Sequence, residues 1–264
     1  MGEPKTGVIT GATSGIGAAF AHAFAAQGYN LILTGRREPR LSELAQEIKD
    51  QYDVSVQKQL IELADVQQVN PFIDALRSQP IDLLINNAGF GMRSTFLQAE
   101  SETLEQMVTV HSTVPMQLMH ALLPGMKERR SGIMINVASI AGFFPLPRSG
   151  VYAATKAFLT LLSESLYVEL KGTGVKVQAL CPGMTITDFH SRLGKDPERY
   201  YKKRGVMKAM TPRAVVKASL KCLDKDKPVC IPGGNNRLLA NIPRFLNKSM
   251  LYKLARAARN RETE

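Results

Sequence analysis

A glycine-rich stretch near the start of the chain has the composition of a phosphate-binding turn. Thr10 to Gly17 reads Thr-Gly-Ala-Thr-Ser-Gly-Ile-Gly, between a short apolar run at 7–9 and an alanine-rich run at 18–26. Glycine allows a sharp turn from strand to helix and a close approach of the main chain to a ligand. The unpaired N–H groups at the start of such a helix attract negative charge. The stretch therefore predicts a dinucleotide cradle, with an ordinary tight turn as the alternative.

Charged residues follow the next two predicted strands. Arg36 and Arg37 come after the strand predicted at 29–34, and Asp65 follows the third strand. At the first of these places an arginine suits a 2′-phosphate, whereas an acidic residue would bind the adenosine ribose. The arginines therefore predict NADP(H), with an ordinary arginine pair leading into a helix as the alternative. Asp65 has two open roles, as acceptor for the adenine amino group or as the N-cap of a helix.

A second group of polar residues lies in the middle of the chain. Ser139 follows a strand predicted at 132–137, and Tyr152 and Lys156 lie in a helix predicted from 150 to about 170. Residues four apart share one face of a helix, so the phenol and the ammonium are expected side by side.

Apolar runs of strand length alternate with helical periodicity along most of the chain. The strands predicted at 81–85, 132–137 and 175–180 are almost continuously apolar, as in a parallel sheet covered on both faces. The pattern predicts an α/β fold, namely a single-domain Rossmann-type doubly wound parallel sheet of about seven strands with helices on both faces. A long helix is predicted at 104–126 and the last strand at 228–231. We expect a catalytic domain at 1–235 and a C-terminal helical extension of it at 236–264.

Composition narrows the class of protein. The chain has 264 residues, of which 44% are hydrophobic, which is enough for one domain with a substantial core. Its three cysteines are too few and too scattered for a disulfide framework or a zinc site, so we expect reduced thiols, no metal and a cytoplasmic location. No apolar run is long enough to span a bilayer, and the first residues lack a signal-peptide pattern.

Positive charge is concentrated in the last quarter of the chain. Residues up to Ser191 carry 15 basic and 17 acidic side chains, whereas the remainder carries 19 basic and 6 acidic ones. This asymmetry favours an acidic substrate, an acidic protein partner or a membrane surface, with a solvated surface as the plain alternative. We expect no nucleic-acid partner.

Several motifs in this order resemble those of the short-chain dehydrogenase/reductase family. The resemblance covers roughly residues 5–235, and its motifs are Thr-Gly-x-x-x-Gly-x-Gly at 10–17, Asn-Asn-Ala-Gly at 86–89, Ser139, Tyr152-x-x-x-Lys156, and Pro182-Gly183 with Thr187. Each motif is weak alone, but their shared order makes coincidence improbable.

The resemblance implies carbonyl reduction, in which hydride reaches the carbon and a proton reaches the oxygen. Tyr152 would donate the proton, or accept it in the oxidising direction, while the Lys156 ammonium would favour the ionised phenol and bind the nicotinamide ribose. Ser139 would donate to the substrate oxygen. Besides Tyr152 and Lys156, the residues expected to bind NADP(H) are Gly11, Thr13, Ser14, Gly15, Ile16, Gly17, Arg36, Arg37, Asp65, Asn87, Ala88, Gly89, Pro182, Gly183, Thr185 and Thr187.

One position departs from the family pattern. The family usually has asparagine in the long central helix, where its main chain holds a water of the proton relay, and this chain has His111 there. The relay is therefore in doubt. His111 could join it as a catalytic residue, or be a core histidine with a satisfied hydrogen bond.

The last part of the chain has two unusual features. The family places a loop over the substrate at about 184–211, and here that loop is strongly basic. A basic amphipathic helix is then predicted from near Pro243. Its apolar arc holds Leu246, Met250, Leu251, Leu254, Ala257 and Ala258, and its basic arc holds Arg244, Lys248, Lys253, Arg256 and Arg259. It would cover its own domain or a second subunit, attach to a membrane, or dock an acidic carrier.

Together these features predict an NADPH-dependent oxidoreductase that reduces a carbonyl to an alcohol reversibly and forms a homodimer or homotetramer. The favoured substrate is a 3-oxoacyl thioester on coenzyme A or acyl carrier protein, or another lipid-like ketone. The alternatives are a steroid or small-ketone dehydrogenase, and an NADP-binding regulatory or scaffold protein without turnover. The motifs serve the cofactor and proton transfer, so they do not identify the substrate.

Overall fold

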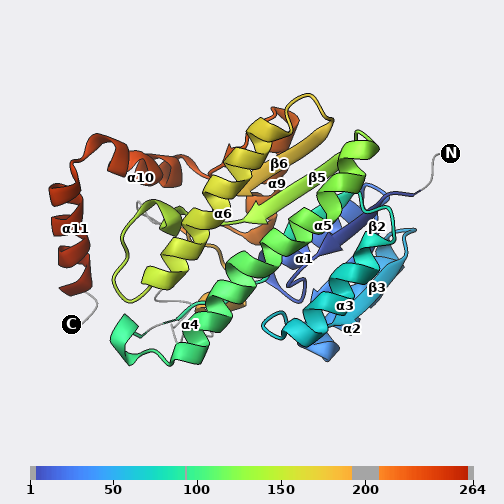
Figure 1. Cartoon of the computed structure of the whole chain (residues 1–264), viewed down its shortest axis with the longest axis horizontal. Helices are drawn as coiled ribbons and strands as arrows, with labels where there is room; N and C mark the ends of the chain where they lie inside the picture. The colour runs from blue at the N-terminus through green and yellow to red at the C-terminus, as the bar shows by residue number, and fades with distance from the viewer. Residues whose placement is uncertain (1–3, 93, 192–207, 261–264) are drawn as a thin grey trace.

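A computed structural model describes residues 4–92, 94–191 and 208–260. At its centre is a parallel sheet of seven strands in the order β3-β2-β1-β4-β5-β6-β7 (Figure 1). The strands are β1 (Thr6–Ile9), β2 (Asn30–Gly35), β3 (Val56–Leu60), β4 (Leu83–Asn86), β5 (Gly132–Val137), β6 (Val175–Leu180) and β7 (Val229–Cys230). This order confirms the predicted doubly wound sheet, because the chain builds one half outward from β1 and the other outward from β4.

Helices cover both faces of the sheet. The longer ones are α1 (Gly15–Ala25), α2 (Glu38–Gln51), α3 (Val66–Arg77), α4 (Ser101–Val108), α5 (Val114–Glu128), α6 (Gly150–Glu169), α9 (Pro212–Asp224), α10 (Gly234–Phe245) and α11 (Lys248–Asn260). Shorter turns are η1 (Phe96–Gln98), η2 (Thr109–Thr113), η3 (Ile140–Phe143) and α7 (Asp188–Ser191). Within the ranges given above, no helix is both long and apolar enough to cross a membrane.

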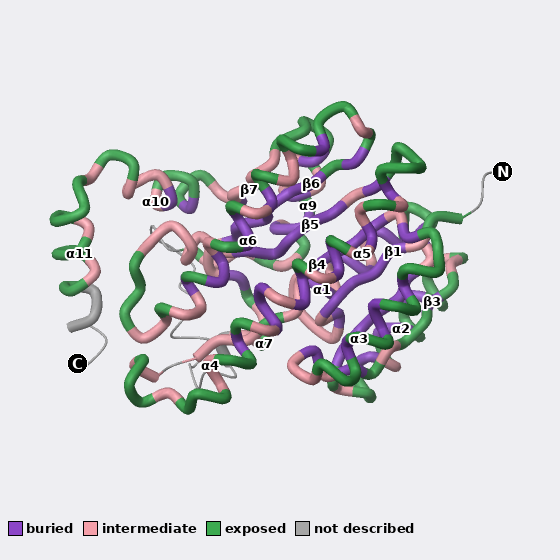
Figure 2. Tube along the Cα trace, in the orientation of Figure 1, coloured by how far each residue is buried: buried purple, intermediate pink, exposed green. Residues whose placement is uncertain are grey.

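Neighbouring residues of each strand enter different halves of the core. In β1, Ile9 packs with residues of α1, α2 and α9, whereas Val8 packs with residues of α3 and α5. β4 repeats this division with Ile85 and Leu84. Figure 2 shows the resulting buried centre, with exposed residues on the outer sides of the helices. Because both faces are covered, the central strands are almost continuously apolar, and β4 and β5 each carry one buried asparagine.

The helix predicted at 104–126 is interrupted. The chain forms α4, then a single π-helical turn over η2, then α5. In this turn the Val114 N–H bonds to the Thr109 carbonyl, five residues back. Pro115 follows immediately and has no N–H with which to continue a regular α-helical ladder. His111 therefore lies in a widened turn instead of a regular helix.

The prediction that one helix begins near Pro243 was wrong. Pro243 lies inside α10, and a second helix, α11, begins only at Lys248. Leu246 is the C-cap of α10, and Asn247 caps the start of α11, because its side-chain oxygen accepts from the Met250 N–H at 2.9 Å. Such an N-cap fixes the start of a helix more directly than a proline does. Of the predicted apolar arc, Leu246 lies between the two helices and the other five residues lie in α11.

A chain of buried amides joins the centre of the sheet to α6. Asn86 on β4 donates to Asn136 Oδ1 on β5 at 2.8 Å, and Asn136 donates to Ser163 Oγ on α6 at 2.8 Å. Ser163 in turn donates to the Leu159 carbonyl at 2.6 Å. Asn136 and Ser163 are fully buried. Buried polar groups of this kind must keep their partners, because water cannot replace them.

We expect Asn136→Ala to lower the free energy of unfolding by about 1–3 kcal/mol, because it leaves the Asn86 amide and the Ser163 hydroxyl without their central partner. Urea unfolding followed by circular dichroism measures this. The matched control is Gln46→Ala, which removes an exposed side-chain bond to Asp50 and should change stability by less than about 0.5 kcal/mol. Equal, small effects of both substitutions would contradict a structural role for the amide chain.

Candidate active site

The turn after β1 is so close to two neighbouring loops that its glycines have no room for a side chain. Gly11 has a φ of +64°, and a Cβ there would lie 2.7 Å from Cα of Ala88. Gly15 has a φ of +61°, and a Cβ there would lie 2.7 Å from Cγ2 of Thr187. At both positions the positive φ favours glycine, and the short distance to the neighbouring loop leaves no room for a Cβ. The loops after β4 and β6 close onto the turn, as a dinucleotide cradle requires.

Hydrogen bonds fix the position of the loop after β4. The Thr10 hydroxyl accepts from the main-chain N–H groups of Asn87, at 3.0 Å, and Ala88, at 3.1 Å. The Asn87 amide donates to the carbonyls of Thr10 and Gly11 at 3.0 and 2.9 Å. Asn87 therefore supports the turn through its side chain. The role of Thr10 in this contact was not evident from spacing alone.

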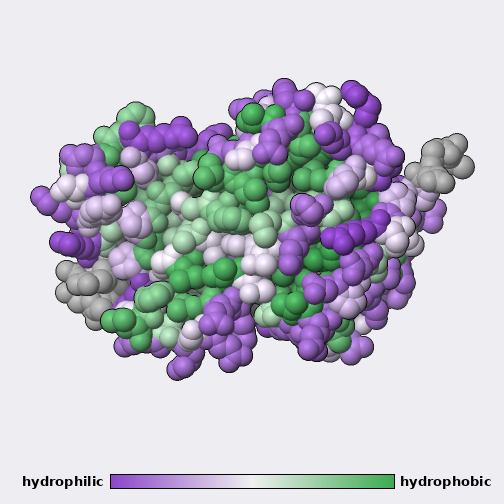
Figure 3. Space-filling model, in the orientation of Figure 1, coloured by the Kyte–Doolittle hydropathy of each residue, from purple (hydrophilic) through white to green (hydrophobic). Residues whose placement is uncertain are grey.

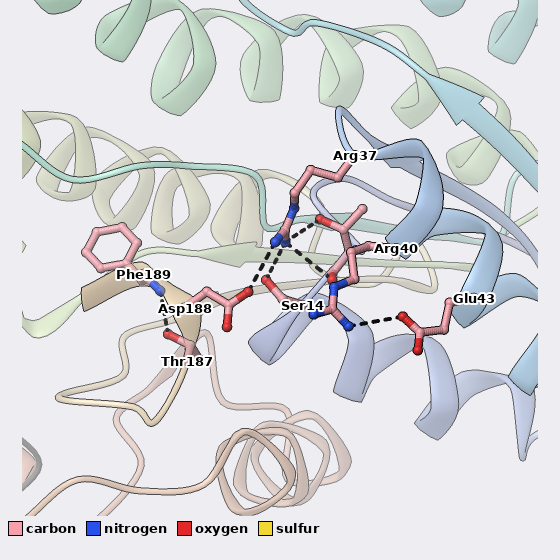
Figure 4. A network of polar contacts seen from close by, with 8 residues as sticks. Ser14, Arg37, Arg40, Glu43, Thr187, Asp188 and Phe189 are labelled. Carbon is pink, nitrogen blue, oxygen red and sulfur yellow. Dashed lines mark hydrogen bonds and ion pairs between the residues drawn. The ribbon is translucent and has the colours of Figure 1, made fainter. Parts of the chain in front are cut away.

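Arg37 joins the glycine turn to the loop after β6 (Figure 4). Its guanidinium donates to the hydroxyls of Thr13 and Ser14 at 2.9 and 3.0 Å, and it pairs with Asp188 at 3.2 Å. Arg36 instead pairs with Glu62 at 2.8 Å. A guanidinium beside two hydroxyls and the start of α1 suits a phosphate group. The residues present thus fit the anionic part of a dinucleotide, with Arg37 closer to the turn hydroxyls than Arg36.

One cleft of about 1150 Å³ contains most of the predicted site. The predicted residues that line it are Gly11, Thr13, Ser14, Gly15, Ile16, Arg36, Arg37, Asn87, Ala88, Gly89, Ser139, Tyr152, Lys156, Pro182, Gly183, Thr185 and Thr187. Gly17, Asp65 and His111 are absent from its described lining. The cleft therefore brings together segments from six places in the sequence along the carboxyl ends of the strands.

The middle of the cleft holds the three residues predicted to carry the chemistry. Ser139 ends the loop after β5, and its hydroxyl accepts from the Ala141 N–H at 3.1 Å. Tyr152 lies in the first turn of α6, and the Lys156 ammonium lies 5.7 Å from the centre of its ring. Lys156 is buried and donates to the Val137 carbonyl at 2.8 Å. Burial lowers the pKa of Lys156 to about 8, because a low-dielectric environment disfavours the charged form.

His111 connects the loop after β4 to α6 from beneath the cleft. Its Nε2 accepts from the Phe90 N–H at 2.9 Å, so the proton of the neutral ring lies on Nδ1. Nδ1 faces the Thr155 hydroxyl at 3.3 Å, and that hydroxyl donates to the Tyr152 carbonyl at 2.8 Å. Burial, and next the nearby Lys156 ammonium, hold the pKa of His111 well below its usual value of 6.5. His111 is thus a neutral core histidine with both ring nitrogens bonded.

The loop after β6 is tied to the C-terminal helices. The Ile186 N–H bonds to the Met210 carbonyl at 2.9 Å, and the Met210 N–H bonds to the Met184 carbonyl at 2.9 Å. A Cβ on Gly183 would lie 2.4 Å from the side chain of Asn236, a buried residue of α10. Within the loop predicted at 184–211, residues 192–207 lie outside the described residues. The bonded ends of the loop bring α10 to the edge of the cleft.

The family model for short chain dehydrogenases matches residues 5–198. The chain belongs to the short-chain dehydrogenase/reductase family. The protein is therefore an oxidoreductase of a family that uses a nicotinamide cofactor, as the order of its motifs predicted.

Individual relatives differ in what they act on. Sulfoacetaldehyde reductase 2 of Chromohalobacter salexigens is 39% identical over 186 residues, which are 69% of this chain and 73% of that protein. A very-long-chain 3-oxoacyl-CoA reductase of Laccaria bicolor is 35% identical over 177 residues, 66% of this chain and 52% of that protein. The structure of a short-chain dehydrogenase from Sphingobium yanoikuyae in complex with NADPH has a TM-score of 0.80 and 31% identity, and the match covers 98% of this chain and 95% of that one.

The geometry shows a structural contact for two predicted site residues of this short-chain dehydrogenase. Asp65 is the N-cap of α3, because its side chain accepts from the Gln67 N–H at 2.9 Å and from the Gln68 amide at 2.8 Å. His111 has the geometry of the core histidine that was one of its two predicted roles. The adenine contact of Asp65 and the relay role of His111 stay predictions. In the described part of the chain, no cluster of acidic, cysteine or histidine side chains is arranged to hold a metal ion.

The buried His111 should make the free energy of unfolding depend on pH. Its folded-state pKa lies well below 6.5, so between that pKa and 6.5 the unfolded chain binds more protons than the folded one. The free energy of unfolding should therefore fall as the pH falls from about 7 to about 5. In His111→Asn this part of the slope should be lost, as measured by urea unfolding at several pH values. The control is His120→Asn, because His120 is exposed, and this variant should keep the wild-type dependence of the free energy of unfolding on pH. The same dependence in the wild type and both variants would contradict the role given to His111.

Proposed function

We propose that this short-chain dehydrogenase is an NADPH-dependent carbonyl reductase that also works in the alcohol-oxidising direction. The observation that carries the proposal is that Ser139, Tyr152 and Lys156 line the same cleft as the glycine turn. Carbonyl reduction needs hydride at carbon and a proton at oxygen. The bound nicotinamide would supply the hydride. The chain would supply the proton and the contacts that stabilise the oxygen.

The three side chains have separate tasks in this proposal. Tyr152 donates the proton to the substrate oxygen, and the Ser139 hydroxyl donates a hydrogen bond to that oxygen as negative charge develops. An ammonium has three N–H donors, and the bond to Val137 uses one of them. Lys156 is thereby held beside the Tyr152 ring, where its charge stabilises a phenolate. In the reverse direction Tyr152 takes the proton from the alcohol.

The arrangement of the arginines supports NADP(H) as the cofactor. Arg37 already bonds the hydroxyls of Thr13 and Ser14, and Arg36 lines the same cleft. A 2′-phosphate would add acceptors for both guanidinium groups. The similar structure from Sphingobium yanoikuyae contains NADPH, which agrees with this choice. The other predicted contacts at the glycine turn and at 182–187 would hold the pyrophosphate and the nicotinamide.

For the substrate we propose a 3-oxoacyl thioester on coenzyme A or acyl carrier protein, or another lipid-like ketone. The basic last quarter of the chain suits an anionic carrier. The similarity to a very-long-chain 3-oxoacyl-CoA reductase supports the same class. Steroids and small ketones are the competing substrates, and the catalytic residues would serve all of them equally.

We further propose a cytoplasmic homodimer or homotetramer. Exposed apolar side chains lie on α5 and α6, and Figure 3 shows hydrophobic residues over the middle of this face. They include Met116, Phe158, Leu161 and Val168, of which the last is 72% exposed. A patch of this kind is typical of a contact between subunits. Peripheral membrane contact would instead use the basic C-terminal helices. Binding of the protein to anionic vesicles would test this alternative.

Tyr152→Phe should reduce carbonyl turnover by about a hundredfold or more, because it removes the proton donor and keeps the ring. Binding of NADPH, followed by the fluorescence of the dihydronicotinamide, should remain within about threefold of wild type. Turnover is measured as NADPH oxidation across acyl thioesters, steroids and small ketones. A wild-type protein that binds NADPH but reduces none of them, with no effect of Tyr152→Phe in cells, would support the scaffold alternative instead.

Arg37→Ala and Arg36→Asp should each raise the KM for NADPH by about ten- to a hundredfold while changing the KM for NADH far less, because a charged hydrogen bond to phosphate is lost. Steady-state kinetics with both cofactors measures the ratio. Arg40→Ala is the control, since Arg40 pairs with Glu43 on the surface at 3.1 Å and is not part of the described lining. Equal effects on NADPH and NADH would remove the arginine concerned from the phosphate site.

A further inference from the structure

A second, smaller cavity lies beside the catalytic cleft. It has a volume of about 390 Å³ and runs between α11 and the loop that precedes α6. Figure 1 shows α11 standing next to this loop, at the end of the molecule away from β3. We call this cavity the outer groove. Its lining includes Pro145, Leu146 and Pro147 from the loop and Tyr252, Ala255 and Arg256 from α11.

The outer groove borders the catalytic cleft. Leu146 and Pro147 line both the outer groove and the catalytic cleft. The catalytic cleft also contains Ser139 and Tyr152, and Leu239 of α10 forms part of its wall. Because the two cavities share this wall, a chain that starts at Ser139 and Tyr152 and passes over the 145–147 loop would reach the outer groove. The C-terminal helices α10 and α11 thus line part of both cavities, and they contain none of the residues predicted to bind the cofactor.

The chemistry of the outer groove suits an aliphatic chain. Proline, leucine and alanine side chains and a tyrosine ring form most of its lining, and the stem of an arginine can cover apolar surface while its charged end stays in water. Such a surface offers few partners for a polar group, whose burial would be unfavourable. Each methylene group placed there leaves water, which is favourable.

Only one side of α11 takes part. Residues advance by about 100° along a helix, so Tyr252, Ala255 and Arg256 lie on one side and Met250, Leu254 and Ala257 on the other. The first set lines the groove, whereas Met250, Leu254 and Ala257 are not in its described lining. Ala255 and Ala257 are thus the same residue type, two positions apart, on opposite sides of one helix. This pair allows a matched test.

We propose that the outer groove binds the aliphatic chain of an extended carbonyl substrate whose carbonyl lies at Ser139 and Tyr152. The proposal rests on the proposed reductase function and specifies the substrate class, a carbonyl compound with a linear apolar chain. The chain leaves the catalytic cleft past Leu146 and Pro147 and lies against Tyr252 and Ala255 of α11. The C-terminal helices then determine chain-length preference while the strand ends carry out the reaction.

The test uses a series of methyl alkyl ketones from butanone to tridecanone, with NADPH oxidation as the readout. In the wild type, KM should fall by about threefold to fourfold for each added methylene that enters the groove. Ala255→Trp fills the groove, so it should raise KM for the longest ketones by at least about tenfold and leave butanone unchanged. Ala257→Trp should behave as wild type at every length. Equal KM values of Ala255→Trp and wild type for the long ketones would overturn the proposal.

A binding measurement separates this proposal from the proposed function. Dansyl-undecanoic acid is titrated into the full-length protein with NADPH present, and its fluorescence reports binding without turnover. Binding that Ala255→Trp weakens and Ala257→Trp does not would support the groove even if no ketone were reduced. Binding that both variants leave unchanged would place the chain elsewhere. Should Ala255→Trp fail to fold, Tyr252→Glu places a charge in the groove and must weaken binding of the probe.

Discussion

The contact between the turn after β1 and the loop after β4 determines how the site is assembled. The Thr10 hydroxyl and the Asn87 amide join the two segments through four hydrogen bonds. The absence of a side chain at Gly11 lets Ala88 approach the turn. Because β1 and β4 are neighbours at the centre of the sheet, this contact lies where the two halves of the doubly wound fold meet. The loops after β5 and β6 then complete the cleft from one side.

The sheet could be predicted because burial on both faces restricts the composition of its strands. Ile9 and Val8 serve different halves of the core and are both apolar, and the same holds for Ile85 and Leu84. The predicted strands therefore lie within a few residues of the observed ones. Most predicted site residues also meet in one cleft, because parallel strands have their carboxyl ends at one edge of the sheet. Their individual contacts did not follow, since distant loops supply the partners.

Helix boundaries were less predictable than the strands, because they depend on local hydrogen bonds. One continuous helix and two helices joined by a short turn can have the same hydrophobic periodicity. The observed bounds depend on single hydrogen bonds, such as the one from the Met250 N–H to Asn247 and the one from the Val114 N–H to Thr109. Asn247 was a readable N-cap signal, but Pro243 nearby was a competing one. The side of α11 that faces the domain depends on the turn between α10 and α11, which periodicity does not describe.

The contacts of His111 show what a departure from the family pattern does to the structure around it. The family role at this position belongs to the main chain, which here lies in a π-helical turn, and the His111 ring lies 5.6 Å from the ring of Tyr152 in the first turn of α6. Both nitrogens of the imidazole have hydrogen-bond partners within the protein. These bonds run to Phe90 and, through Thr155, to the carbonyl of Tyr152. The substitution therefore connects the loop after β4 to the helix that carries the tyrosine, and the low pKa of His111 keeps that connection neutral beside the Lys156 ammonium.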